Sequence, residues 1–540
     1  MDDLHLLELI ILLMVVVLAL TAIAEKLLIP YPILLVIGGL ALTVMPGLPV
    51  VHLDPELVFL VFLPPILWAA AYFTSFREFR ANLRPIGLLA VGLVLVTTAA
   101  VAAVARALLP DMGWPAAIAL GAIVSPPDAV SAVAVAKRLH IPRRLVTILE
   151  GESLVNDATA LVLYRAAVVA VLSGRFLLGE TLLEFAYAAT VGIAVGLAVA
   201  GLAKQVLKVT KDSFTEIAIT LLAPYIAWVF AEQIHASGVL ACVAGGLYVR
   251  RYFSTIVAPM TRIQARAVWE LLIFLLNGVI FILIGLQLSA LQNAVAPDRL
   301  TALIVVATAV SATVILMRVL WVPLVAVVSR VVSPSLRKRD PLPPWSHLFI
   351  IGWTGMRGIV TLAAALAIPL TTATGAPFPF REEIILISFG VILATLVLQG
   401  LSLTPLIRAL HVEADQSQEG EERHARVRAA EAALAHLDRL AGRDWLVAEH
   451  LDQMRSHYGR RMERYAKDGQ AETLCTPEEA AAFRRLRHET LTAERLAVIR
   501  LRNEGTISDE LLHRLEHELD VEALRHGLGE QRVSMMDQHT

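Results

Sequence analysis

The stretch TILEGESLVNDATALVLYR, residues 147–165, carries polar side chains inside a run that is otherwise apolar. Its polar members within about two helical turns are Glu150, Glu152, Ser153, Asn156 and Asp157. On a helix, residues four apart share a face, so Glu152 with Asn156 and Ser153 with Asp157 can line one cavity. An ionisable side chain at the centre of a bilayer costs roughly 2.5–3.5 kcal/mol and usually faces a bundle interior or water. The stretch therefore predicts a polar site within a membrane helix.

The composition of the chain agrees with a membrane protein. Of its 540 residues, 57% are hydrophobic and only 17% are charged, whereas soluble domains are about half apolar and a quarter charged. The formal net charge of -2 gives no basic footprint for nucleic acid, so we expect none as a partner.

The apolar runs predict how often the chain crosses the bilayer, because a spanning helix needs about 20 mostly apolar residues. Thirteen segments are candidates: 4–24, 27–46, 55–73, 83–109, 114–136, 145–173, 180–206, 214–232, 237–250, 267–290, 301–330, 345–371 and 382–410. Loops on one side carry eighteen Arg or Lys residues, and loops on the other side carry three. The positive-inside rule then places the N-terminus outside and the C-terminal region in the cytoplasm. We expect a multi-pass protein of the inner cell membrane.

The C-terminal region differs in composition from the rest. From EADQSQEGEERHARVRAAEAALAHLDRL (413–440) onward it is charged, with few β-branched runs. We expect residues 1–411 to form the membrane domain and residues 412–540 a mostly helical cytoplasmic region with an assembly or regulatory role.

A second polar segment is GAIVSPPDAVSAVAVAKRL, residues 121–139. Pro126 and Pro127 lack backbone N–H groups and clash with the preceding turn, so a helix breaks there. Carbonyls freed at this depth must be satisfied by protein or by water in a cavity. Asp128 follows directly, and broken helices are a common way for secondary transporters to build an ion site. The segment predicts such a site, with Asp128 in it.

Two arginines also lie in apolar runs. Arg318 needs a carboxylate partner inside the membrane, and Glu152 is the candidate for a structural ion pair. Arg357 lies in IIGWTGMRGIVTLAAALAIP, residues 350–369, where three glycines permit local unwinding. We expect Arg357 to balance the charge of Asp128 or Asp157 at a second broken helix when no cation is bound.

Together these segments resemble the monovalent cation/proton antiporters, which include the sodium/proton exchangers. The run SPPDAVSAVAVAKRLHIPRRLVTILEGESLVNDATALVLY, residues 125–164, is similar to the family's broken helix followed by a helix with Glu-Ser-Leu-x-Asn-Asp. WELLIFLLNGVIFILIGLQL (269–288), Arg318 and GWTGMRGIVTLAAALA (352–367) resemble its later helices in the same order.

The resemblance implies an all-α fold of thirteen helices, built as two six-helix inverted repeats with two crossing broken helices. It also implies a homodimer whose core domains move in an elevator-like manner. By position, Asp157 is the residue that binds Na⁺ and the proton, with Asn156 beside it. Ser153 matches a cation ligand, and Pro127 stands where the family commonly has a Thr whose carbonyl contributes. Glu152 with Arg318 matches a buried salt bridge, and Arg357 matches the arginine at the second crossing.

Two departures from the family's pattern bear on which cation is carried. The family's Thr-Asp-Pro reads PPD at 126–128, so a threonine hydroxyl is lost while a carbonyl remains. In FLPPILWAAAYF, residues 62–73, Ala69 occupies the position at which many members carry a Glu. The expected activity is electroneutral exchange of cytoplasmic Na⁺ for external H⁺ by alternating access. Li⁺ and K⁺ are further candidate substrates, and no cofactor is expected.

Three other readings are open to the same residues. The first is a K⁺/H⁺ antiporter of the same fold. The second is an intramembrane aspartyl protease using Asp128 and Asp157 as a dyad, but the chain has no Gly-x-Gly-Asp segment. The third is a channel, which would want a filter loop or a ring of like residues. Neither feature is visible in the sequence, and we expect a transporter rather than an enzyme.

Overall fold

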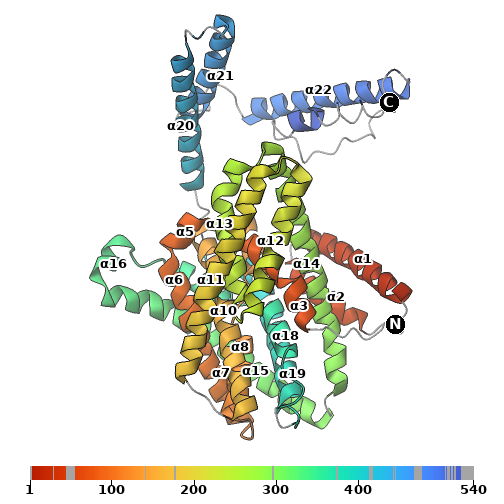
Figure 1. The fold of residues 1–540 in the computed structure, drawn as a ribbon, viewed down its shortest axis with the longest axis vertical. Helices are drawn as coiled ribbons and strands as arrows, with labels where there is room; N and C mark the ends of the chain where they lie inside the picture. Colours follow the sequence, from red (N-terminus) through yellow and green to blue (C-terminus); the bar gives the residue numbers. More distant parts are fainter. Residues whose placement is uncertain are drawn as a thin grey trace. The chain divides into compact units, whose positions relative to one another are not determined.

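The computed structural model of the protein describes residues 3–27, 30–43, 55–139, 141–174, 178–294, 297–372, 375–412, 417–441, 443, 446–466, 477–504, 506, 511, 515 and 518–523. The chain divides into two compact units, Met1–Asp415 and Gln416–Thr540. In both units the described residues are almost entirely helices joined by turns (Figure 1).

The first unit is a bundle of helices of unequal length. In chain order these are α1 (Asp3–Leu27), α2 (Tyr31–Leu42), α3 (Pro55–Val61), α4 (Leu63–Phe73), α5 (Phe76–Ala81), α6 (Leu83–Gly87), the π-helical turn η1 (Leu88–Leu93), α7 (Val94–Leu108), α8 (Trp114–Val124), α9 (Val130–Arg138), α10 (Arg143–Ser173), α11 (Leu178–Val209), α12 (Ser213–Gln233), α13 (Gly238–Ile256), α14 (Pro259–Ala294), α15 (Pro297–Val332), α16 (Pro334–Arg339), α17 (Trp345–Trp353), α18 (Ile359–Leu366) and α19 (Arg381–Ala409).

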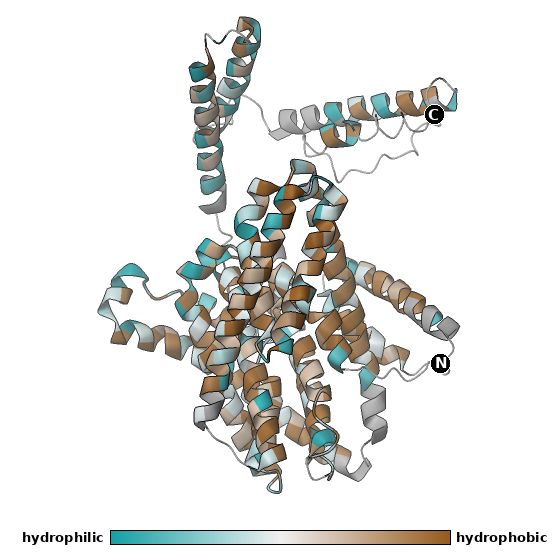
Figure 2. Ribbon diagram, in the orientation of Figure 1, coloured by the Kyte–Doolittle hydropathy of each residue, from teal (hydrophilic) through white to brown (hydrophobic). Residues whose placement is uncertain are grey.

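Eight helical segments among the described residues are long and apolar enough to cross a membrane. They are Pro55–Phe73, Leu83–Leu108, Arg143–Ser173, Leu183–Val209, Ser213–Gln233, Pro259–Gln287, Leu300–Val332 and Arg381–Ala409. Figure 2 shows that apolar residues dominate along these helices. Of the other predicted segments, 4–24 and 237–250 coincide with the continuous helices α1 and α13, 27–46 with the short helix α2, and 114–136 and 345–371 with interrupted helices. Residues 28–29 and 44–46 of the second segment lie outside the described residues. The protein is therefore an all-helical, multi-pass membrane protein, and the count of thirteen crossings stays a prediction.

Two of the predicted crossings are interrupted in the middle. The first runs as α8, a non-helical break at residues 125–129, and α9. The second runs as α17, a break at residues 354–358, and α18. The two breaks touch, because the amide of Asp128 donates to the carbonyl of Met356 at 2.7 Å. The predicted pair of crossing broken helices is present, and it positions the polar residues considered below.

Other helices of the first unit also pack with their backbones in close contact. A side chain at Gly39 of α2 would overlap the backbone of α14 at Ile282. A side chain at Gly196 of α11 would likewise overlap the backbone of α13 at Ala241. In lipid, helices associate through close packing because no hydrophobic drive acts between them. Small residues such as these glycines permit that close approach.

The second unit contains α20 (Ser417–Leu440), α21 (Ala448–Ala466) and α22 (Pro477–Asn503). Helices α20 and α21 pack against each other and are joined by an ion pair between Arg455 and Asp438 at 2.7 Å. Figure 2 shows many more hydrophilic residues here than in the first unit, as expected for a charged helical region.

Candidate functional site

Helix α10 carries the polar residues of the opening stretch across the interior of the first unit. It runs without a break from Arg143 to Ser173. Glu152, Asn156 and Asp157 are all buried, with exposed fractions of 1%, 0% and 7%. Ser153 is half-buried. Neighbouring helices therefore cover this face of α10.

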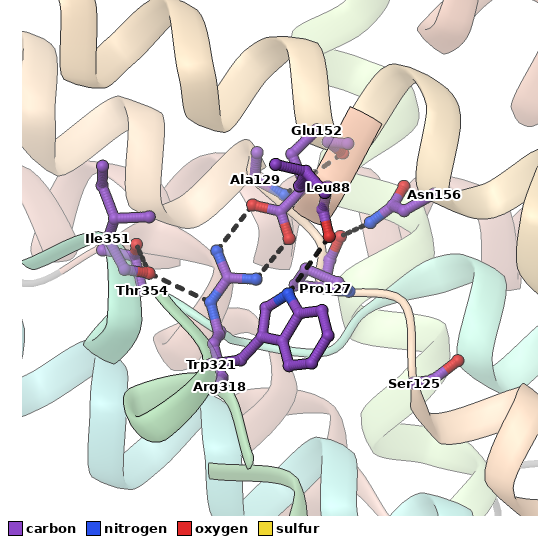
Figure 3. A network of polar contacts seen from close by, with 12 residues as sticks. Leu88, Ser125, Pro127, Ala129, Glu152, Asn156, Arg318, Trp321, Ile351 and Thr354 are labelled. Atoms are coloured by element: carbon purple, nitrogen blue, oxygen red, sulfur yellow. Dashed lines mark hydrogen bonds and ion pairs between the residues drawn. The ribbon is translucent and has the colours of Figure 1, made fainter. Parts of the chain in front are cut away.

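The buried carboxylate of Glu152 forms an ion pair with Arg318 of α15 (Figure 3). Each side chain is only 1% exposed. Both guanidinium Nη atoms face the carboxylate, and Nη2 lies 2.7 Å from Oε2. The remaining Nε–H donates to the carbonyl of Ile351 on α17 at 3.0 Å. Arg318 thus neutralises Glu152 and joins three elements through one planar group.

The broken helix α8–α9 meets α10 at Asn156. The side-chain amide of Asn156 donates to the carbonyl of Pro127 at 2.9 Å (Figure 3). This carbonyl lies where the double proline prevents continued helical bonding. The Ser153 hydroxyl lies 3.5 Å from the backbone amide of Ala129, at the outer limit of a hydrogen bond. Pro127, Ser153 and Asn156, which the sequence analysis assigned to one site, are brought together here.

Asp128 has a structural role that the sequence did not predict. Its Oδ1 accepts a hydrogen bond from the amide of Val130 at 2.9 Å, which caps the first turn of α9. On its other side lies Gly358, where an added Cβ would overlap the Asp128 carboxylate. Asp128 is therefore held between the start of α9 and the second break.

The carboxylate of Asp157 differs from those of Glu152 and Asp128 in its lack of a partner in the described part of the chain. Among the residues that the structure describes, it takes part in no hydrogen bond or ion pair, although the residue is buried. The neighbouring Oδ1 of Asn156 is also buried without a hydrogen-bond partner. A carboxylate and an amide oxygen without hydrogen-bond donors are suited to a proton or a small hard cation, and burial makes an unpaired carboxylate costly.

Arg357 lies in the second break, and its direct hydrogen-bond partners are backbone carbonyls. Its guanidinium donates to the carbonyls of Val124 at 2.9 Å, Ser125 at 3.1 Å and Gly355. Within the described ranges it forms no ion pair with Asp128 or Asp157. Val124 ends α8, and the C-terminal end of a helix carries partial negative charge. Arg357 therefore balances the end of a half-helix in place of direct contact with a carboxylate.

Polar residues of α19 were missed from the sequence. Thr395, which is fully buried, accepts a hydrogen bond from the amide of Arg357 at 3.1 Å. Gln399 is also fully buried, and neither atom of its amide has a partner. The signal was available, because Gln399 is a polar side chain within an apolar span. Ala69, the departure noted above, is buried in α4 and offers no polar atom.

Comparisons with known proteins identify the family of the chain. Residues 11–409 match the family described as sodium/hydrogen exchanger, transmembrane. An uncharacterised Na⁺/H⁺ exchanger of Mycobacterium tuberculosis is 37% identical over 499 residues, which covers 92% of this chain and 91% of the relative. The sodium, potassium, lithium and rubidium/H⁺ antiporter of Bacillus pumilus is 32% identical over 389 residues, covering 70% and 58%.

The fold is also found among solved structures. The sodium proton antiporter MjNhaP1 of Methanocaldococcus jannaschii superposes with a TM-score of 0.58 at 20% identity, covering 76% of this chain and 99% of that one. At this identity the likeness speaks for the fold alone. The sequence match over residues 11–409, together with a relative that is 37% identical over nearly the whole chain, means that this protein belongs to the sodium/hydrogen exchanger family.

Proposed function

We propose that this protein exchanges Na⁺ for H⁺ across the inner cell membrane and that Asp157 holds the two ions in turn. The observation that carries the proposal is the buried, unpaired carboxylate of Asp157 beside a half-satisfied Asn156. Membership of a cation/proton exchanger family supports the reaction class and leaves the aspartyl protease and channel readings without support.

The mechanism is a competition at one carboxylate. A carboxylate removed from water is stable only when it is neutralised, either by a proton or by a cation. Asp157 can hold one of these but not both. Ser153, Asn156 and the carbonyl of Pro127 supply further oxygen ligands for a cation, and Asp128 lies in the adjoining break. Alternating access then carries whichever ion is bound, in a homodimer with an outside N-terminus and a cytoplasmic C-terminal unit.

The test is the substitution Asp157→Asn, which removes the charge and keeps the size. In everted membrane vesicles, we expect it to abolish cation-driven proton flux while the protein still inserts into the membrane. The matched control is Glu150→Gln on the same helix, where a half-buried carboxylate lies two residues from the buried pair. This control should leave the flux near that of the unchanged protein. Retained flux in Asp157→Asn would overturn the assignment.

The cation itself is the second part of the proposal. Na⁺ is favoured by the compact set of oxygen ligands, and K⁺ is the runner-up because Ala69 contributes no carboxylate. The Bacillus pumilus relative is named for sodium, potassium, lithium and rubidium, so a broad specificity has precedent. Dose responses for Na⁺, Li⁺ and K⁺ on purified protein in liposomes, compared at several pH values, should show half-saturation at the lowest concentration for Na⁺. Saturation by K⁺ at a lower concentration would make the protein a K⁺/H⁺ antiporter.

A further inference from the structure

A cavity of about 400 Å³ lies among α6, η1, the start of α10, the end of α15 and the segment leading into α17. Its wall is mostly apolar and includes Leu89, Leu145, Ile148, Val322 and Leu348. None of the residues proposed to hold the transported ion lines it. Its size and apolar wall are typical of a site for a small molecule or a lipid chain.

Three arginines also line the cavity, against one carboxylate. Asp340 accepts hydrogen bonds from both Nη atoms of Arg144 at 2.8 and 2.9 Å, and from Arg330 at 2.7 Å. The hydrogen bonds from Arg144 lower the pKa of Asp340 below its usual 3.8, so Asp340 is ionised at neutral pH. Among the described residues the third arginine, Arg84, has no carboxylate partner and donates only to the carbonyl of Ser329 at 3.0 Å. The lining therefore keeps an excess of positive charge.

The neighbourhood of the cavity has the markers of a membrane boundary. Helix α16, which ends in Arg337, Lys338 and Arg339, immediately precedes the lining residue Asp340. Large apolar side chains beside it are exposed, with Val332 at 77% and Trp345 at 62%. Exposed apolar residues next to a basic cluster fit the level of the lipid headgroups, where Trp is also enriched.

We propose that this cavity binds one anionic phospholipid of the surrounding bilayer. The phosphate would lie between Arg84 and Arg144, and an acyl chain would follow the apolar wall. Basic pockets between membrane helices are suited to anionic headgroups. A soluble anion would make no contact with the apolar wall, and a zwitterionic lipid would not neutralise the excess positive charge. The bound chain would also contact Ile351, whose carbonyl accepts from Arg318, so the lipid would support the buried ion pair.

The test is native mass spectrometry of the full-length protein in detergent, with phosphatidylglycerol or phosphatidylcholine added. We expect the unchanged protein to retain one phosphatidylglycerol per chain in preference to phosphatidylcholine. Arg84→Gln should weaken this retention about fivefold, as expected for one basic residue near a membrane surface. Ala326→Phe, which adds bulk to the cavity wall, should weaken it independently of charge. The matched control is Arg80→Gln, an exposed arginine of α5 that does not line the cavity.

The outcomes that would overturn the proposal are distinct from a failure of the transport assignment. Equal retention of the two lipids by the unchanged protein would show that the cavity does not select an anionic lipid, which would contradict the proposal. An equal loss of phosphatidylglycerol retention in Arg84→Gln and Arg80→Gln would mean that general surface charge, and not the cavity, binds the lipid. Displacement of phosphatidylglycerol by millimolar inorganic phosphate would mean a site for a soluble anion. None of these readouts requires cation exchange, so the lipid site can fail while Asp157 retains its role, and the reverse.

Discussion

At the scale of single residues, Glu152 and Arg318 form a fully buried ion pair. Because both side chains are 1% exposed, removing one partner leaves an uncompensated buried charge, which costs about 3–5 kcal/mol. We predict that Glu152→Gln and Arg318→Met each lower the thermal unfolding temperature in detergent. The double substitution should cost clearly less than the sum, since it leaves no lone charge.

An exposed pair of the same type provides the control for this cycle. Arg266 and Glu270 lie 2.8 Å apart with side chains 73% and 56% exposed, and such pairs contribute roughly 0–1 kcal/mol. Their removal should barely change the unfolding temperature. Additive costs for Glu152 and Arg318 would mean that the two residues do not act as a pair.

At the scale of elements, the crossing of the two broken helices depends on Gly358. A Cβ there would overlap the Asp128 carboxylate, which caps α9. We predict that Gly358→Ala shifts the break and lowers exchange roughly tenfold or more in everted vesicles, since small displacements of reacting groups are costly. Gly201→Ala in α11 is the control, because open space surrounds that position. If both variants exchanged normally, close approach at the crossing would not be a requirement.

At the scale of the whole molecule, the buried charges predict how exchange responds to voltage. Arg318 neutralises Glu152, and the Asp128 carboxylate is engaged at the start of α9. Arg357 faces carbonyls and Asn156 is neutral, which leaves Asp157 to take one positive ion at a time. We predict electroneutral exchange, one H⁺ for one Na⁺. In liposomes, imposing 100 mV with the gradient of a lipophilic organic ion should leave the Na⁺-driven flux unchanged, although 100 mV is worth about 2.3 kcal/mol per net charge moved. Liposomes with Asp157→Asn correct for leak, and a flux that followed the voltage would contradict the prediction.

Much of this arrangement follows from local patterns in the chain. The double proline at 126–127 and the three glycines around Arg357 predicted both breaks, because each removes or weakens local helical bonding. The contact of Glu152 with Arg318 was predicted because neither charge is stable alone in an apolar interior. The all-helical membrane fold follows from the length of the apolar runs.

The remaining details depend on contacts between distant parts of the chain. The charge balance that Arg357 is expected to provide stays a prediction, and the direct bonds from its guanidinium to carbonyls more than 230 positions away could not be predicted. No periodicity within either segment indicates that the C-terminal end of α8 lies against the second break. The capping role of Asp128 could not be told from the sequence, because an aspartate at this depth in the membrane fits an ion ligand as well as the cap of α9.

The two buried arginines have a consequence for the energetics of the transport cycle. Arg318 bonds side chain and backbone on α10 and α17, and Arg357 bonds the end of α8. Helices joined by these bonds should move as one rigid body. The ligands around the bound ion would then be the same in the inward-facing and outward-facing states. The intrinsic affinities facing in and out would then be similar. Forward and reverse exchange would then have similar half-saturation concentrations, and the two ion gradients would fix the direction of net exchange, as they do for any coupled exchanger.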